Sequence, residues 1–137
     1  LIRYRTRDLS RLLPDPCPCG LELPRHDRIL GRSDDMIIFR GVNIYPGQIA
    51  EVLETFPELS SEYQIRLTRQ HGVDVMVLRV ERHPGARKDA DGNLSEAVST
   101  GLRRRLMVRC AVHILDPGDL PRTFAKSKRV LDERDSE

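Results

Sequence analysis

GRSDDMIIFRGVNIYPGQIAE, residues 31–51, is the stretch of the sequence that decides the fold. It opens with a polar turn that carries two adjacent acids, Asp34 and Asp35, and continues with a short apolar run over residues 36–39. Two neighbouring acids are not needed to start a strand, so the turn suggests a joint or a binding site. Pro46 then suits the first turn of a helix, where its missing N–H would have no intrahelical partner.

The helix that follows Pro46 is indicated by the spacing of its apolar residues. They recur three and four positions apart, which predicts an amphipathic helix over residues 46–56, and Pro57 ends it. The residues of this stripe are Ile49, Val52, Leu53 and Phe56. A β-like run over residues 36–40 precedes the helix, and Gly41 is needed at a turn or bulge.

Beyond this helix the sequence alternates between strand and helix patterns. Residues 63–69 and 73–81 read as two strands joined by a hairpin at Gly72. A second helical stripe covers residues 93–108, and a last strand follows at residues 111–115. The order from residue 36 onward is therefore β-α-β-β-α-β. We predict an α+β, ferredoxin-like domain with two helices on one face of an antiparallel sheet.

The first 30 residues have a different character. Residues 1–8 read as a strand, and residues 9–13 as a second short one. Residues 14–20, PDPCPCG, form a Pro-rich turn, and residues 21–30 form an extended link. Because a strand at the very start of the chain needs a neighbour for its backbone groups, we expect the chain to be a piece of a longer protein.

Composition narrows the class of protein. The 137 residues make about one domain, and the formal net charge of +2 gives no argument for nucleic acid. No apolar run approaches the roughly 18 residues that span a membrane. Three cysteines, an odd number, argue against a secreted disulfide framework and favour the reducing cytoplasm. The arginine triplet at residues 103–105 is interpreted as the solvated face of a helix, with a phosphate-binding patch as the alternative.

Three short motifs stand in an order that resembles a known superfamily. They are YRTRD at residues 4–8, GRSDD at residues 31–35 with Gly41 after it, and PRTFAK at residues 121–126. Their order and spacing resemble the C-terminal part of the adenylate-forming enzymes, which include the acyl-CoA synthetases. The forms RYRTRDL, CPCG and RGVNIYPGQIAE are similar to phenylacetate–CoA ligases and related aryl-acid ligases.

This resemblance implies a reaction in two steps. A carboxylic acid and ATP, with Mg²⁺, give an acyl-adenylate, and the CoA thiol then displaces AMP to form the thioester. The C-terminal domain rotates about a hinge between the two steps. On this basis residues 1–33 are expected to be the end of a large N-terminal adenylation domain, and residues 34–137 the mobile C-terminal domain.

The resemblance also implies the partners of the protein. They are an aromatic acid of the phenylacetate, benzoate or anthranilate type, ATP, CoA and the missing N-terminal domain. Nucleic acid and membrane are not expected, and oligomerisation is left open. The phosphate loop and the acid pocket of such enzymes are absent from this sequence, so we expect the chain alone to be inactive.

Five residues match functional positions of the superfamily. Asp8 matches the acid that binds the ribose hydroxyls, and Arg32 an arginine near the ribose and phosphate. Asp34 matches the hinge residue, and Gly41 the glycine that faces the pantetheine tunnel of CoA after rotation. Lys126 matches the lysine that reaches the acid carboxylate and the α-phosphate. An ammonium group held there would stabilise the negative charge that gathers at phosphorus during adenylation.

The match has departures and competing interpretations. Arg7 stands where the wider superfamily usually has glycine, and Ala125 stands where the motif has glycine before the lysine. Lys128 is a competing candidate for the reactive lysine. Asp8 is alternatively an ordinary strand-end residue, and Arg32 a surface arginine paired with a neighbouring acid.

Two further features support other hypotheses. Cys17, Cys19 and His26 offer three zinc ligands with poor spacing, whereas structural zinc takes four, and Cys110 is far away in sequence, so we predict no metal. The alternative function is a stand-alone ferredoxin-like module that binds a small ligand or RNA. RNA-binding modules of that shape present aromatic side chains on their central strands, and here the strands after the first helix offer only Tyr63.

Overall fold

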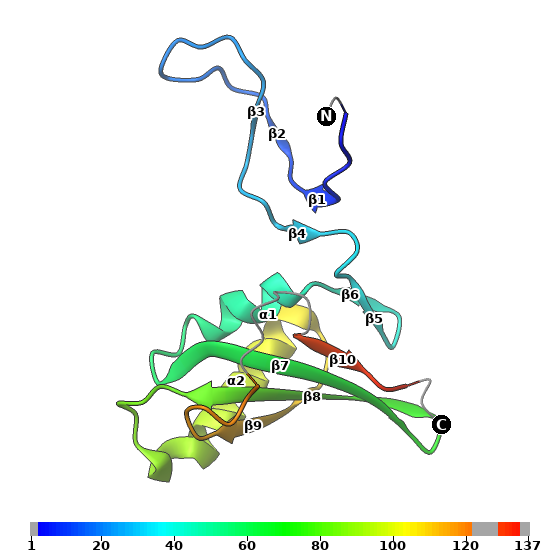
Figure 1. Cartoon of the computed structure of the whole chain (residues 1–137), viewed down its shortest axis with the longest axis vertical. Helices are drawn as coiled ribbons and strands as arrows, with labels where there is room; N and C mark the ends of the chain where they lie inside the picture. The colour runs from blue at the N-terminus through cyan, green and yellow to red at the C-terminus, as the bar shows by residue number, and fades with distance from the viewer. Residues whose placement is uncertain (1–2, 122–128, 135–137) are drawn as a thin grey trace.

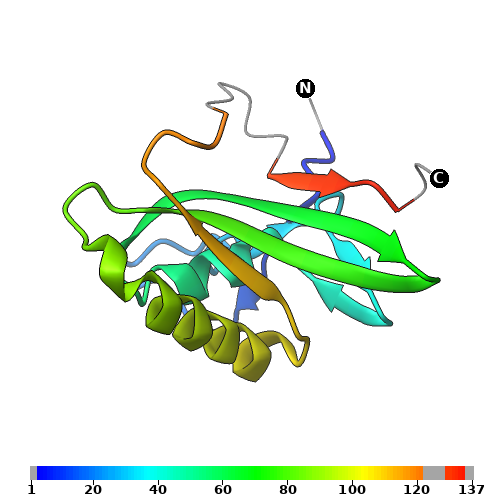
Figure 2. The ribbon, with the colours of Figure 1, turned by 90° about the horizontal axis from the view of Figure 1, so that it is seen from below.

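The structure is a computed structural model that describes residues 3–121 and 129–134. Its body is a four-stranded sheet in the order β10–β7–β8–β9, with the helices α1 and α2 against one face (Figures 1 and 2). Among the described residues, no helix is both long enough and apolar enough to cross a membrane.

The two central strands of the sheet form one long hairpin. β7 (Leu59–Gln70) and β8 (Val73–Arg82) pair antiparallel around a two-residue turn, in which His71 and Gly72 both have positive φ angles of 51° and 77°. Such left-handed backbone at both central residues matches the twist of the flanking strands. The apolar residues that alternate along the hairpin are buried against the helices; among them are Ile65, Leu67, Met76 and Leu78.

The outer strands run parallel to their neighbours. β9 (Ala111–Leu115) lies beside β8, to which it is joined through α2, and β10 (Val130–Asp132) lies beside β7 with Val130 opposite Ile65. A strand that returns through a helix on one face of the sheet pairs in parallel. The predicted antiparallel sheet is thus mixed, because β9 and β10 both run parallel to their neighbours.

The two helices complete the core. α1 (Pro46–Leu53) buries Ile49, Val52 and Leu53, and α2 (Asp91–Leu106), which follows the short 3₁₀ turn η1 (Lys88–Ala90), buries Val98, Leu102 and Leu106. The helices approach closely at Gly101, where an added Cβ would lie 3.1 Å from Cγ1 of Val52. Glycine at this position therefore permits the contact between the helices.

The run at residues 36–40 forms a separate small hairpin. β5 (Ile37–Phe39) pairs with β6 (Val42–Ile44) around Arg40 and Gly41, whose φ angles are 49° and 80°. The guanidinium of Arg40 donates two hydrogen bonds, of 2.9 and 2.6 Å, to the carbonyl of Asp74 in β8. The predicted strand exists, but its two-residue turn pairs it with the next residues of the chain instead of with the large sheet.

Residues 3–34, called here the N-terminal segment, lie outside the helix–sheet body (Figure 1). They form two small ladders of two-residue strands. β1 (Asp8–Leu9) pairs with β4 (Gly31–Arg32), and β2 (Leu12–Leu13) pairs with β3 (Arg25–His26), all antiparallel. The Pro-rich turn forms the loop between β2 and β3.

The α+β class and the order of strands and helices agree with the sequence prediction, and three further details differ besides the mixed sheet and the β5–β6 pairing. α1 ends at Leu53, and turns occupy the remainder of the predicted helix. Residues 3–7 are not a strand, because Arg3 and Arg7 have positive φ angles of 60° and 65° that interrupt extended backbone. The polar tail, for which the sequence predicted no strand, supplies β10.

Candidate functional site

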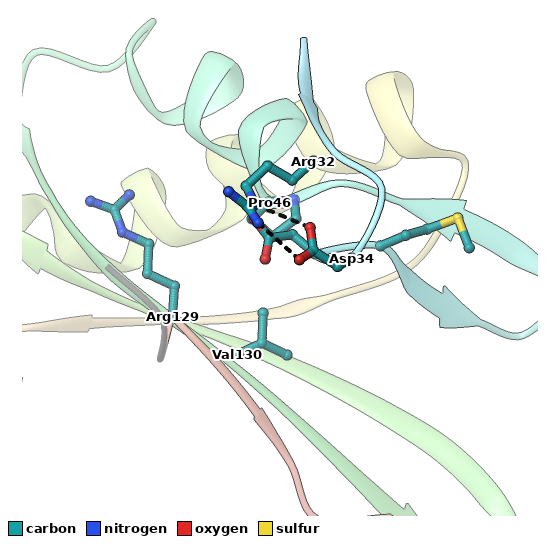
Figure 3. Close-up of a pocket in the computed structure, with 7 residues that line it drawn as sticks. Arg32, Asp34, Pro46, Arg129 and Val130 are labelled. Carbon is teal, nitrogen blue, oxygen red and sulfur yellow. Dashed lines mark hydrogen bonds and ion pairs between the residues drawn. The ribbon is translucent and has the colours of Figure 1, made fainter. Parts of the chain in front are cut away.

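A pocket of about 500 Å³ lies where the N-terminal segment meets the body (Figure 3). Arg32 ends β4, Asp34 follows it in the turn, and Pro46 is the first residue of α1. Arg129 and Val130, at the start of β10, line the pocket on the side facing these three residues. Asp35 and Met36 complete the lining.

Arg32 and Asp34 form a two-pronged ion pair in this pocket. Nε and Nη2 of Arg32 donate to Oδ1 and Oδ2 of Asp34 at 3.0 and 2.9 Å, and Nη1 of Arg7 lies 3.5 Å from Oδ2. The hydrogen bond from Arg32 lowers the pKa of Asp34 from 3.8 to about 2. Because folding lowers this pKa, the pair contributes stability above pH 3.8 and loses it as the pH falls through about 2.

The ion pair with Asp34 does not use all the N–H donors of Arg32. A guanidinium carries five N–H donors, of which Asp34 takes two, so the others are available to a phosphate group. The β1–β4 ladder places Asp8 opposite Arg32, and the Asp8 carboxylate contributes to the raised pKa of Arg32, after Asp34 and Asp35. A carboxylate accepts hydrogen bonds from two adjacent hydroxyls. The structure thus brings Asp8, Arg32 and Asp34 together at one end of the N-terminal segment.

The backbone conformation at residue 7 explains why the superfamily usually has glycine where this chain has Arg7. Its φ of 65° lies in the left-handed region, which glycine adopts without steric cost. The arginine here accepts that conformation and directs its guanidinium toward Asp34.

Gly41 lies apart from this group of residues. It occupies the tip of the β5–β6 hairpin and does not line the pocket. Its φ of 80° explains why glycine suits this position, and an added Cβ would meet no atom within 4 Å. The residue is therefore in a tight turn and not at a bulge.

Lys126 and its competitor Lys128 lie outside the described residues. The residues on either side of them are anchored to the sheet. Leu120 is buried and its N–H donates to Oε1 of Glu81 at 2.9 Å, while the carbonyl of Arg129 accepts a 2.7 Å hydrogen bond from the N–H of Ile65.

Sequence reasoning missed Arg129 and Tyr63 as neighbours of the site. The guanidinium carbon of Arg129 lies 4.4 Å from the centre of the Tyr63 ring, and the Tyr63 hydroxyl donates to the carbonyl of Pro46 at 2.9 Å. Spacing alone gives no signal for a contact between residues so far apart in the chain. Pro46 itself was recognised, but only as a helix start.

The cysteines do not assemble a metal site. Sγ of Cys17 and Sγ of Cys19 are 2.8 Å apart, and the hydrogen bond from Cys17 lowers the pKa of Cys19. Nδ1 of His26 lies 2.6 Å from the carbonyl of Asp27. Within residues 3–121 and 129–134, no three His, Cys, Asp or Glu side chains gather where they could hold a metal ion.

Comparison with known proteins identifies the class to which this fold and site belong. The family model for the AMP-binding enzyme C-terminal domain matches residues 41–134. The phenylacetate-coenzyme A ligase of Aromatoleum evansii is 37% identical over 142 residues, which cover 100% of this chain and 32% of that enzyme. The chain thus spans about a third of the length of this relative.

Solved structures give the same class. A domain of phenylacetate-coenzyme A ligase from Bacteroides vulgatus is 33% identical with a TM-score of 0.68, covering 76% of this chain and 97% of that one. 2-Hydroxyisobutyryl-CoA ligase in its postadenylation state is 34% identical with a TM-score of 0.80, covering 95% of this chain and 28% of that one. In its thioesterification state the same enzyme gives a TM-score of 0.68 at 34% identity, covering 94% and 28%.

These matches define an α+β domain of adenylate-forming ligases. The chain belongs to the family of AMP-binding enzyme C-terminal domains.

Proposed function

We propose that the chain is the C-terminal part of an ATP-dependent aryl-acid CoA ligase of the phenylacetate type. The enzyme would adenylate an aromatic acid, with Mg²⁺ bound to ATP as part of the substrate, and then transfer the acyl group to CoA. The domain would rotate at Asp34 between the two steps. The relatives named above as phenylacetate-coenzyme A ligases support this chemistry.

The observation that carries the proposal is the Arg32–Asp34 pair at the junction between the N-terminal segment and the body. It combines a guanidinium suited to phosphate with a small, exposed residue that has no heavy packing. Asp8, in the adjoining strand, adds a carboxylate suited to ribose hydroxyls. Nucleotide binding and rotation would thus share one short turn.

A difference between two states of one relative supports rotation about this turn. The chain resembles 2-hydroxyisobutyryl-CoA ligase better in the postadenylation state than in the thioesterification state, with TM-scores of 0.80 and 0.68 at the same 34% identity. A rigid body that swings relative to the N-terminal segment would give such a difference. We infer that the arrangement described here corresponds to the state that follows adenylation.

Residues 1–33 would belong to the large domain of the enzyme, and Asp34, the last residue of the N-terminal segment, would begin the mobile domain. Six of the nine exposed large apolar side chains among the described residues lie in this segment. They are Tyr4, Leu12, Leu21, Leu23, Ile29 and Leu30. The remainder of the N-terminal domain would cover them.

The experiment that tests the proposal is Lys126→Ala in the full-length enzyme, with each half-reaction measured separately. We expect loss of acyl-adenylate formation and normal thioester formation from supplied acyl-adenylate, because the ammonium group acts only in the first step. Equal loss of both half-reactions, or no loss of adenylation, would contradict the role of Lys126.

Two controls accompany this experiment. Lys128→Ala removes the neighbouring ammonium and is expected to retain adenylation, whereas selective loss in this variant would move the role to Lys128. The 137-residue chain alone is expected to give no ATP–pyrophosphate exchange. Measurable exchange by the pure chain would show that it holds the whole adenylation site.

The alternative, an RNA-binding module, has little support from the side chains. Tyr63 is 5% exposed and is covered by the guanidinium of Arg129, so its ring is not available for stacking on a base. Salt-dependent RNA binding by the chain would revive this alternative.

A further inference from the structure

Cys17 and Cys19 lie in the loop between β2 and β3 (Figure 1), and their sulfur atoms are 2.8 Å apart. The N–H of Gly20 donates to the carbonyl of Cys17 at 3.0 Å and closes a tight turn over residues 17–20. Pro18 takes the second position of this turn and Gly20, with a φ of 82°, takes the fourth, where such residues are favoured. The backbone of the loop therefore holds the two thiols close together.

The loop that carries this turn is fixed at its base. Leu13 of β2 pairs with Arg25 of β3, and Nη2 of Arg25 donates to the carbonyl of Asp15 at 3.1 Å. Cys17 is half-buried and lines a hollow of about 530 Å³ within the loop, whereas Cys19 is exposed and does not line it. The two thiols thus differ in how easily a reagent from solvent reaches them.

This arrangement suits an exchange reaction with an external disulfide. The hydrogen bond from the Cys17 thiol, followed by one from the backbone N–H of Leu21, lowers the pKa of the exposed Cys19. A lower pKa raises the fraction of thiolate, which is the attacking species. Cys17 can then attack the sulfur of Cys19, because a disulfide bond of about 2.0 Å requires the two sulfurs to approach by less than about 1 Å.

We propose that Cys17 and Cys19 form a site of reversible oxidation, at which a low-molecular-weight disulfide such as oxidised glutathione is the oxidant. The thiolate of Cys19 attacks the external disulfide, forms a mixed disulfide and releases one thiolate of the reagent. The Cys17 thiol gives up its proton to that thiolate, and its sulfur attacks the sulfur of Cys19 and displaces the second thiol of the reagent. Two cysteines are oxidised to one disulfide, and the reagent is reduced to two thiols.

The disulfide formed at this site is expected to be easily reduced. It would close a ring across one intervening residue, Pro18, and a disulfide that departs from relaxed geometry is strained and more reducible. Strained or exposed disulfides are the labile ones, which suits a site that is oxidised and restored repeatedly. The proposal goes beyond the proposed ligase function and does not depend on it, because neither cysteine lines the pocket that contains Arg32 and Asp34.

The test follows both cysteines of the 137-residue chain by peptide mass. Trypsin cleaves after Arg11 and Arg25, so one peptide contains Cys17 and Cys19 without Cys110. After oxidised glutathione, and alkylation of the remaining thiols in urea, we expect this peptide to lose two hydrogen atoms and to carry neither glutathione nor an alkyl group. Reduced glutathione is expected to reverse the change. A peptide that stays fully alkylated, carries glutathione on both cysteines or is linked to a second chain would overturn the proposal.

Two single substitutions separate the roles of the two cysteines. Cys17→Ser is expected to stop at the mixed disulfide on Cys19, because no second thiol can displace the glutathione. Cys19→Ser leaves only the half-buried Cys17 in the loop, and its modification is expected to be at least about tenfold slower. Faster modification of Cys19→Ser than of Cys17→Ser would overturn the assignment of Cys19 as the attacking thiol.

Gly20 tests whether the turn holds the sulfurs together. In Gly20→Ala the added Cβ meets no atom within 4 Å, but alanine is strained at a φ of 82°. We expect the turn to open and the mixed disulfide to accumulate, with ring closure at least about tenfold slower. Gly92→Ala in α2 is the matched control, because Gly92 also has open space around it but no positive φ, and its oxidation should be unchanged. Ring closure in Gly20→Ala at the rate of Gly92→Ala would contradict positioning of the thiols by the turn.

Discussion

The N-terminal segment and the body differ in how they are held together. The body buries its apolar side chains in one core, all of whose residues lie from Ile37 onward. The segment has strands of only two residues and leaves side chains such as Leu23 and Ile29 exposed. The body therefore has its own core, to which no residue of the segment belongs.

Among the described residues, few ion pairs join the two regions. Apart from the turn at Asp34, Arg28 of the segment pairs with Glu51 of α1 at 3.0 Å, and Glu51 also pairs with Arg105 of α2 at 3.0 Å. These are exposed ion pairs, each worth about 0–1 kcal/mol. Such a junction would resist rotation only weakly, which is compatible with the proposed hinge at Asp34.

The largest expected effect comes from the core. Leu102→Ala, at a residue with 0% exposure, is expected to lower the free energy of unfolding of the chain by about 2–5 kcal/mol. Leu23→Ala in the segment is expected to change it by less than about 0.5 kcal/mol, because Leu23 is 69% exposed. Urea denaturation followed by circular dichroism measures both.

The Leu23→Ala variant also tests the comparison between segment and body in the full-length enzyme. There Leu23→Ala is expected to become destabilising by about 1–2 kcal/mol, because the large domain would cover the side chain. A Leu23→Ala variant that remained neutral in the full-length enzyme would argue against such a cover.

The reactivity of the thiols is expected to differ between the two regions. Burial raises the pKa of Cys110 to about 11, whereas Cys17 and Cys19 lie in the segment and the pKa of Cys19 is lowered. Since the thiolate is the reactive form, we expect Cys110 to react with a disulfide reagent at pH 8 at least about a hundredfold more slowly than the other two. The reaction is followed spectrophotometrically, and all three thiols should react in urea. Rapid reaction of all three in the folded chain would mean that Cys110 is not buried.

The same burial has a consequence at high pH. Because folding raises the pKa of Cys110 above its unfolded value of 9.0, the folded state binds the thiol proton more tightly. The stability of the body is therefore expected to fall as the pH rises above 9.

The ion pairs of the two regions should also contribute differently to the free energy of unfolding, but by a smaller amount. The Arg82 side chain is 8% exposed and pairs with Asp91 at 2.5 Å and with Asp116, whereas Arg11 of the segment pairs with Asp27 at 2.8 Å but is 73% exposed. Arg82→Met is expected to cost about 2 kcal/mol, because it removes the ion-pair partner of the partly buried Asp91. Arg11→Met is expected to cost less than about 1 kcal/mol. Equal effects in urea denaturation would contradict the difference between body and segment.

The sequence predicted the parts of the fold in which local pattern and burial agree. The stripe from Ile49 to Leu53 and the hairpin at Gly72 were correct because periodicity and turn residues act over short distances. β10 was missed because its partner β7 lies some 60 residues earlier, and a three-residue strand is too short to show a period of its own. The pairing of β5 with β6 was missed because the left-handed Arg40 is unusual for a residue other than glycine.

The candidate site was predictable only through the resemblance to a family. Asp8, Arg32 and Asp34 were named from motifs, and the β1–β4 ladder brings them together. Arg129 and Tyr63 were not found, because their contact depends on the three-dimensional course of the chain. Gly41 was correctly expected at a turn, and its role toward CoA stays a prediction.

The measurement that tests the central claim most directly compares Asp34→Pro with Asp34→Ala in the full-length enzyme, with each half-reaction assayed separately. Proline fixes φ and so restrains a hinge, whereas alanine removes the same carboxylate but leaves the backbone free. If residues 3–34 and the body rotate about Asp34, the proline variant retains adenylation at the level of the alanine variant but loses thioester formation by at least about tenfold. Equal rates for the proline and alanine variants in both half-reactions would contradict a hinge at Asp34.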